Sequence, residues 1–429
     1  MKRRFRIAAD ETFSSLRYRN FRLFFSGQLI SQVGNWLTLV AQALLVLHLT
    51  DNNGVAVGVL TACQFLPVLV LGAWAGLVAD RSDKRRLLLV VQTCAMLQSF
   101  ALAALAFTGD PPLLAIYAVA MIGGVTTAFD NPARRAFVSE MVPVEKIQNA
   151  VSLNSAMMTS ARIFGPALAG LLIVTVGYGW CFLVDGISYL AVLAGLWMMR
   201  PAELRPSTVT PRSTRQVRAG LRYARSTPDL WVPLVMMAVI GTFAFNFSVV
   251  MPLFVKTTLH GTDTTFTLIY SVVSIGSVIG ALTTARRAET HVRNVVTGAA
   301  AFGVAMLAMA ASPTIRSSFV VAVFIGLTSI LFMTSSTAIV QLRAAPEMRG
   351  RVLALQAIVF LGSTPIGGPT LGVVCEVLGA RAGFVLGGAA CLGAAAWGSV
   401  AARHAGVLDS GTRDIAQVPA SVPSAPQGA

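Results

Sequence analysis

Twelve long apolar runs make up most of this chain, and the gaps between them alternate between strongly basic and almost free of positive charge. Each run approaches the ~20 residues that a helix needs to cross ~30 Å of hydrocarbon. The runs centre on 23–47, 55–78, 87–107, 113–129, 150–176, 180–199, 231–254, 265–285, 294–311, 317–340, 352–375 and 383–402. This pattern predicts an all-α membrane protein with twelve transmembrane helices.

The basic residues orient the predicted helices across the membrane. Of the 33 lysines and arginines, all but four lie in the two termini or in every second gap. Lys256, Arg316 and Arg381 fall in the other gaps, and Arg162 falls inside a run. By the positive-inside rule, we expect a multi-pass protein of the plasma (inner) membrane with both termini in the cytoplasm.

Composition excludes several other classes of protein. A mean hydropathy of +0.71 is too high for an ordinary soluble chain of 429 residues. We therefore assign the net charge of +15 to loops that face an anionic leaflet, and expect a lipid bilayer as partner and no nucleic acid. Dispersed cysteines and histidines and the lack of nucleotide or nucleophile motifs predict no metal, no cofactor, no catalytic residue and no enzymatic activity.

A polar segment at the centre of the chain divides the runs six and six. A glycine-proline element in the fifth run recurs in the eleventh, which predicts two six-helix bundles that rock about a site at their interface. The predicted packing residues are Gly165, Pro166 and Gly170, and then Gly368, Pro369 and Gly372. The expected units are a basic segment 1–20, a bundle 21–199, a basic linker 200–230, a second bundle 231–403 and a disordered cytoplasmic tail 404–429. In the linker, Arg215, Arg218, Arg222 and Arg225 are spaced as on one face of a short helix lying along the membrane surface.

The sharpest local motif lies between the second and third runs, where Gly76 is followed by Asp80, Arg81 and a basic cluster. This stretch resembles the signature of the major facilitator superfamily, although Asp83 stands where that family usually has glycine. The resemblance implies the major facilitator fold. A carboxylate at a helix end can pair with arginines or with a neighbouring helix amino terminus, and so hold two bundles together in one state only. The expected latch comprises Gly76, Asp80, Arg81, Arg85, Arg86, Arg134 and Arg135.

Three more segments narrow the resemblance to the branch of enterobactin exporters and macrolide efflux pumps: 130–137, 149–154 and 162–170. This implies a monomeric secondary transporter that exports a small amphipathic molecule, such as a siderophore, a drug or a secreted metabolite, by alternating access. The expected energy source is the proton gradient, although the arginine that proton-coupled drug pumps of the superfamily usually carry in the fourth span is absent. Two alternatives stay open: an importer of the same fold, and a receptor or scaffold that has lost transport.

A polar stripe follows one face of the first run, because Gln28, Gln32, Asn35, Thr38 and Gln42 succeed one another at steps of three or four residues. Such a stripe is costly in lipid, so it must face other helices or water. The predicted substrate cavity comprises Gln28, Gln32, Asn35, Gln42, Asn154, Arg162, Phe243, Asn246 and Gln356. Hydrogen bonds between helices could instead use many of these side chains.

Few ionisable residues fall within or beside the runs. A charge there costs ~3 kcal/mol or more, so Arg162, Asp185 and Glu376 each need a partner, a water-filled cavity or a function. One interpretation is a structural ion pair between Arg162 and Asp185. Another makes Asp185 the leading proton carrier, Glu376 the second candidate and Asp130 the third, because burial favours the protonated form of a carboxyl group.

Overall fold

The computed structural model describes residues 13–205, 215–285 and 290–408. Within this part of the chain every regular element is helical, and twelve segments are long and apolar enough to cross a membrane, which confirms the predicted fold class. The unbroken spans are α2 (Arg19–Leu49), α3 (Gly54–Arg81), α4 (Lys84–Phe107), α5 (Leu113–Glu140), α6 (Ile147–Val176), α7 (Tyr178–Trp197), α11 (Asp263–Ala285), α12 (Val292–Ala311), α13 (Ile315–Arg343), α14 (Pro346–Leu378) and α15 (Ala380–His404).

The seventh span is interrupted, although its sequence is one continuous apolar run. It consists of α9 (Pro228–Phe243), α10 (Phe247–Leu253) and a π-helical turn, η4 (Phe254–Thr258). At the break, Asn246 Nδ2 donates to the carbonyl of Thr242 at 2.7 Å. The side-chain amide replaces a backbone donor, which is how asparagine competes with regular helix.

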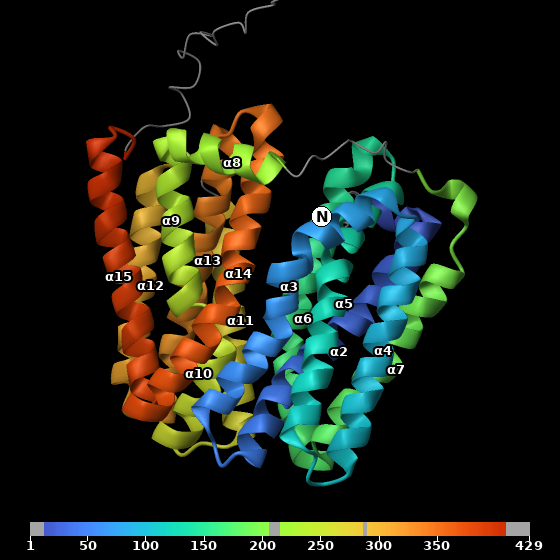
Figure 1. Cartoon of the computed structure of the whole chain (residues 1–429), viewed down its shortest axis with the longest axis horizontal. Coiled ribbons are helices and arrows are strands. Elements are labelled where there is room, and N and C mark those ends of the chain that lie inside the picture. Colours follow the sequence, from blue (N-terminus) through green and yellow to red (C-terminus); the bar gives the residue numbers. More distant parts are fainter. Residues whose placement is uncertain (1–12, 206–214, 286–289, 409–429) are drawn as a thin grey trace, which may run out of the picture.

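Two bundles of six spans lie side by side, α2 to α7 in one and α9 to α15 in the other (Figure 1). They touch chiefly through α3 against α14 and through α6 against α11. The helix predicted from the linker arginines is α8 (Arg215–Ser226), which lies across the end of the second bundle (Figure 1). Of the predicted terminal segments, residues 1–12 and 409–429 lie outside the described residues.

The two ends of the molecule differ in charge. We call the end that carries α8 and the α3–α4, α5–α6 and α13–α14 connections the basic end, and the opposite one the far end. Three basic residues, Lys256, Arg316 and Arg381, fall in the gaps that carry little positive charge, and two of them bond to nearby groups at the far end. Lys256 forms an ion pair with Asp263 at 2.7 Å, and Arg381 donates to the carbonyls of Ala310 and Ser312 that end α12.

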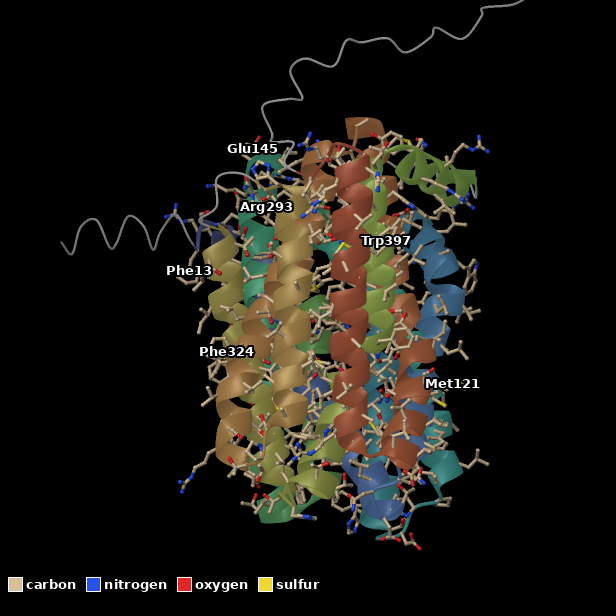
Figure 2. All side chains as sticks on the ribbon, turned by 90° about the vertical axis from the view of Figure 1, so that its left-hand side faces the viewer. Phe13, Met121, Glu145, Arg293, Phe324 and Trp397 are labelled. Atoms are coloured by element: carbon tan, nitrogen blue, oxygen red, sulfur yellow. The ribbon has the colours of Figure 1, made fainter. Side chains whose placement is uncertain are left out.

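The flanks of the molecule are apolar. Phe324, Trp397 and Met121 are more than 40% exposed and point outward from the sides of the bundles, while Glu145 and Arg293 lie at the basic end (Figure 2). A surface of this kind is stable only against lipid tails, because in water it would be an aggregation site.

The turn between α3 and α4 is made without glycine. Ser82 and Asp83 both adopt extended backbone conformations, and Asp83 Oδ1 accepts the N–H of Arg86 at 3.0 Å. Asp83 therefore caps the amino terminus of α4, a role that glycine could not fill with a side chain. At this position the segment thus has a helix cap, where the signature that it resembles has the backbone freedom of glycine.

Candidate functional site

The bundles are joined in the half of the molecule nearer the far end. A Cβ on Gly54 of α3 would lie 2.6 Å from the carbonyl oxygen of Gly372 in α14, and one on Gly58 would lie 2.8 Å from the Cα of Pro369. In the other contact, between α6 and α11, a Cβ on Gly170 would overlap Thr267. Only glycine allows these backbones to approach so closely.

In the half nearer the basic end, the glycines of α3 no longer make such close contacts with α14. A Cβ on Gly72 or on Gly76 would meet no atom within 4 Å. The ribbons of the two bundles accordingly converge toward the far end and diverge toward the basic end (Figure 1). The structure therefore has the two bundles in close contact toward the far end, with their ribbons farther apart at the basic end (Figure 1).

Arg162 lies at the middle of α6, where the bundles meet. Its carbonyl accepts a hydrogen bond from Ser274 Oγ of α11 at 3.1 Å, and Ser274 also donates to the carbonyl of Tyr270, one turn earlier in the same helix. The Tyr270 ring lies 6.2 Å from the ring of Trp36 in α2. Arg162 Nε is buried, and among the described residues it has no acceptor and the guanidinium has no carboxylate partner. A cation and two aromatic rings thus come together from both bundles.

Asn35 faces the same region. Gln42, on the same stripe of α2, bonds to Gln64 of α3 at 2.8 Å, whereas Trp36 packs against Gly165 of α6. Asn35 points between these two directions, and α3 and α6 are the helices that touch the second bundle. Asn35 is exposed, and Asn154 and Phe243 are half-buried; none of the three has a side-chain hydrogen bond or ring contact within the described ranges.

Other predicted cavity residues bond inside one bundle. Gln32 Nε2 donates to Gln28 Oε1 at 3.1 Å, and in the second bundle Gln356 Nε2 donates to Ser336 Oγ at 3.1 Å. Asn246 closes the helix break described above. These buried amides act as contacts between or within helices, the alternative that their spacing left open.

Arg134 is the centre of a buried network in the first bundle. Its Nη2 lies 3.0 Å from Asp130 Oδ2, and its Nη1 lies 3.4 Å from Gln28 Oε1. Asp130 Oδ1 accepts from Gln92 Nε2 of α4 at 2.7 Å. The network joins α2, α4 and α5, so Asp130 is held by an arginine. Sequence reasoning missed Gln92, although the spacing of four between Asp130 and Arg134 was visible.

The other predicted latch residues for which partners can be named also bond within the first bundle. Arg85 Nε donates to the carbonyl of Leu196 at 2.7 Å and so caps the end of α7, and Arg86 lies 3.6 Å from Asp83 on the surface. Asp80 is half-buried at the end of α3, while Arg81 and Arg135 are exposed. The latch remains a proposal for the state in which the basic ends meet.

Asp185 is buried among α2, α4 and α7. Its Oδ2 accepts from Thr38 Oγ1 at 2.6 Å and from Ser99 Oγ at 2.7 Å, while Oδ1 has no donor among the described residues. It does not pair with Arg162, so the structural ion pair that the sequence allowed is not present. Thr38 belongs to the polar stripe of α2, so the stripe provides one of the two donors to this buried carboxyl group.

Glu376, the second candidate for the proton carrier, is not buried. It is exposed in the last turn of α14, and its Oε2 accepts the backbone N–H of Gly54 at 2.6 Å across the bundle interface. The apolar run suggested a buried carboxyl group, but a helix end reaches the membrane surface.

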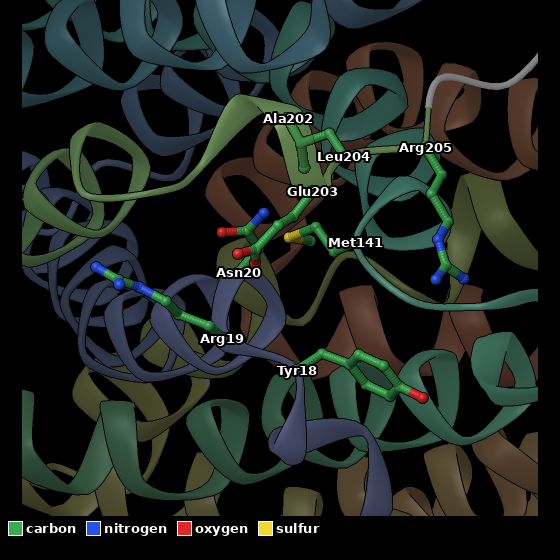
Figure 3. A pocket seen from close by; sticks show the side chains of 8 residues that line it. All are labelled: Tyr18, Arg19, Asn20, Met141, Ala202, Glu203, Leu204 and Arg205. Carbon is green, nitrogen blue, oxygen red and sulfur yellow. The ribbon is translucent and has the colours of Figure 1, made fainter.

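A pocket of about 310 Å³ opens at the basic end (Figure 3). In this view Asn20, Glu203 and Met141 point toward one another, whereas Arg19 and Arg205 point to opposite sides. The lining residues belong to the first bundle and the segment that follows it: Tyr18, Arg19, Asn20, Met141, Ala202, Glu203, Leu204 and Arg205. The second bundle contributes nothing to this lining, so the pocket is separate from the site at Arg162.

Comparison with known families gives a match over nearly the whole chain. Residues 10–414 match the family described as transmembrane secretion effector. The staphyloferrin A transporter of Staphylococcus aureus is 24% identical, over 83% of this chain and 90% of that protein. Macrolide efflux protein A of Streptococcus pyogenes is 22% identical, over 87% and 94%, and the enterobactin exporter of Citrobacter koseri is 24% identical, over 63% and 64%.

Solved structures show the same fold at lower identity. A bacterial homologue of the human lysosomal transporter Spinster, in an inward-facing and occupied conformation, superposes with a TM-score of 0.67 at 15% identity, over 90% of this chain and 97% of that one. The peptide transporter POT superposes with a TM-score of 0.72 at 12% identity, over 90% and 95%. The comparisons therefore support the two-bundle fold that the helices display.

The neighbours Arg134 and Arg135 provide a matched test of the buried network. Arg134→Gln should lower the free energy of unfolding by about 3 kcal/mol, because it leaves Asp130 buried without its cation. Arg135→Gln should lower it by less than about 0.5 kcal/mol, because Arg135 is exposed. Thermal unfolding in detergent measures both, and equal losses would contradict the network.

Proposed function

The chain belongs to the transmembrane secretion effector family of the major facilitator superfamily, and from this premise we propose that it exports a small amphipathic molecule by alternating access. Members of the superfamily are multi-pass membrane transporters, not enzymes. The proposal rests on Arg162, whose guanidinium has no carboxylate partner among the described residues, at the interface of two bundles that are in close contact toward the far end. Export is favoured over import because the relatives include an enterobactin exporter and macrolide efflux proteins.

The basic end is proposed to face the cytoplasm. The excess of lysine and arginine in the loops at this end supports that orientation. With it, the observed state has its parted side toward the cytoplasm, where an exporter takes up its substrate. Return to this state after release would complete the cycle.

The substrate is proposed to carry an anionic group beside an apolar or aromatic body. A guanidinium near the bilayer midplane is unfavourable by ~3 kcal/mol or more unless a partner or water compensates it. An anionic group on the substrate would supply that partner in the loaded state. Trp36 and Tyr270 offer aromatic surfaces beside the cation, and Asn35 offers amide hydrogen bonds. Siderophores and other acidic secreted metabolites have this chemistry.

Proton coupling is proposed to use Asp185. Among the described residues no cation pairs with its carboxyl group, and two hydroxyl groups bond to one of its oxygens. Burial without a cation favours the neutral form that carries a proton. Asp130 is less suited, since it is bound to Arg134, and Glu376 is exposed. Thr38 links Asp185 to α2, the helix that also carries Trp36 and Asn35.

Export itself can be tested in cells that lack their other pumps. Cells producing the protein should accumulate less of at least one compound from a panel of acidic siderophores, aromatic acids and macrolides, and an Asp80→Asn variant at the same surface abundance should restore accumulation. Equal accumulation of every compound with and without the protein would contradict an export function for this panel.

Replacing Arg162 should weaken substrate binding. For a compound that the accumulation assay identifies, we expect Arg162→Ala to raise the dissociation constant by about tenfold or more, because a charge-assisted hydrogen bond contributes ~1.5–3 kcal/mol. Arg162→Lys should restore part of the affinity, since an ammonium keeps the charge but not the forked donors. Calorimetry on purified protein measures the constants, and unchanged binding in Arg162→Ala would make the residue structural.

Replacing Asp185 should separate transport from the proton gradient. Everted vesicles energised to an acidic interior should accumulate the compound in a protonophore-sensitive way, and Asp185→Asn should abolish that sensitivity while binding to purified protein persists. Glu376→Gln serves as the comparison, because its carboxyl group is exposed. Full protonophore-sensitive transport by Asp185→Asn would exclude this residue as the carrier.

A further inference from the structure

Two hydrogen bonds join the bundles at the far end. On one side, Glu376 Oε2 accepts the N–H of Gly54, the first residue of α3, at 2.6 Å. On the other side, Tyr178 Oη donates to Oδ2 of Asp263, the first residue of α11, at 2.7 Å. Since α3 and α11 are the second spans of their bundles, each bond connects the start of a second span to the other bundle.

The two bonds occupy equivalent places in the repeat. Gly177 lies between α6 and α7 with φ +93°, and Gly379 lies between α14 and α15 with φ +84°, so the same turn joins the fifth and sixth spans of each bundle. Tyr178 directly follows one of these glycines, and Glu376 precedes the other by three residues. The start of each second span is thus bonded beside the fifth-to-sixth turn of the opposite bundle.

Small residues support both bonds from the interior. Behind the Glu376 bond, Gly54 and Gly372 are in backbone contact, and behind the Tyr178 bond Gly170 packs against Thr267. Close contact at both places fixes the distance between the bundles and lets the polar groups reach each other. At the far end each side of the interface therefore combines a glycine contact with a hydrogen bond at the rim.

We propose that these two bonds form a far-end lock, defined by Glu376 with Gly54 and by Tyr178 with Asp263, which holds the far end closed and must break in every transport cycle. Glu376 lies at the carboxyl-terminal end of its own helix, where the helix dipole disfavours negative charge, and meets the amino-terminal end of α3, where the dipole favours it. Separation of the bundles removes only the favourable contact. The lock therefore stabilises the closed far end and no other state.

Lys256 determines which part of the second bond moves. It forms an ion pair with Asp263 at 2.7 Å, and both side chains belong to the second bundle and are less than a fifth exposed. This pair stays intact when the bundles part, so Asp263 remains in position as an acceptor. Tyr178 is the group that arrives and leaves, its ring lying 5.9 Å from that of His48 in the first bundle.

Spin labels at the far end test the lock in purified protein. Cysteines at Asp110 and Arg316, which are exposed in the first and second bundle, would carry the labels after replacement of the native cysteines. Electron–electron distance measurements should show a longer component in Tyr178→Phe and in Glu376→Ala. We expect the ratio of open to closed far ends to rise about fivefold for each variant and about 25-fold for both together.

Matched controls remove similar groups without touching the interface between the bundles. Tyr117→Phe removes a hydroxyl that donates to Ala56 within the first bundle at 2.9 Å, and Glu203→Ala removes a surface carboxylate paired with Arg200. Neither should change the distance distribution. If Tyr178→Phe and Glu376→Ala give the same distance distribution as these controls, the two bonds do not hold the far end closed and the proposal is contradicted. Each single variant removes one group near the rim, so a folding defect in the double variant would leave the test intact.

Discussion

The contact between Gly54 and Gly372 is the one on which the observed arrangement of the bundles depends. With any side chain at either position α3 and α14 would move apart, and the hydrogen bond between Glu376 and Gly54 would be lost with them. Because hydrocarbon provides no hydrophobic force between helices, close van der Waals contact between small residues and polar bonds must hold the bundles together. The far half of the interface has both, whereas a Cβ on Gly72 or Gly76 of α3 would meet no atom within 4 Å.

The buried polar groups differ in where they lie and in whether they have partners. In the first bundle Asp130, Arg134, Gln92 and Gln28 are linked by hydrogen bonds and an ion pair, and Asp185 accepts from two hydroxyl groups. These side chains join helices that move as one body. Arg162 differs because it lies between the bodies and, within the described chain, lacks a counter-ion. That contrast, more than the presence of polar residues as such, identifies the site proposed for the substrate.

Much of the fold could be predicted from sequence because lipid makes hydropathy and charge decisive. The spans and the linker helix follow from run length and arginine spacing, and only the break at Asn246 needed the structure. The site was harder to predict. Helical spacing places Gln28 and Asn35 on one face of α2. It does not predict that Arg134 donates to Gln28 while Asn35 is exposed. Tyr178 and Asp263 lie at the ends of spans, where polar residues are common. Nothing in the sequence there indicates a partner in the other bundle.

In the proposed transport cycle, a path at the bundle interface opens alternately to the two sides of the membrane. Labelling of Asn35→Cys by a membrane-impermeant maleimide, without the native cysteines, tests it most directly. We expect rapid labelling in everted vesicles, where the basic end is outward, and protection in right-side-out vesicles. Adding Tyr178→Phe and Glu376→Ala should increase labelling in the right-side-out vesicles. Equal reactivity from both sides in the parent, or reactivity from neither side in any variant, would contradict it.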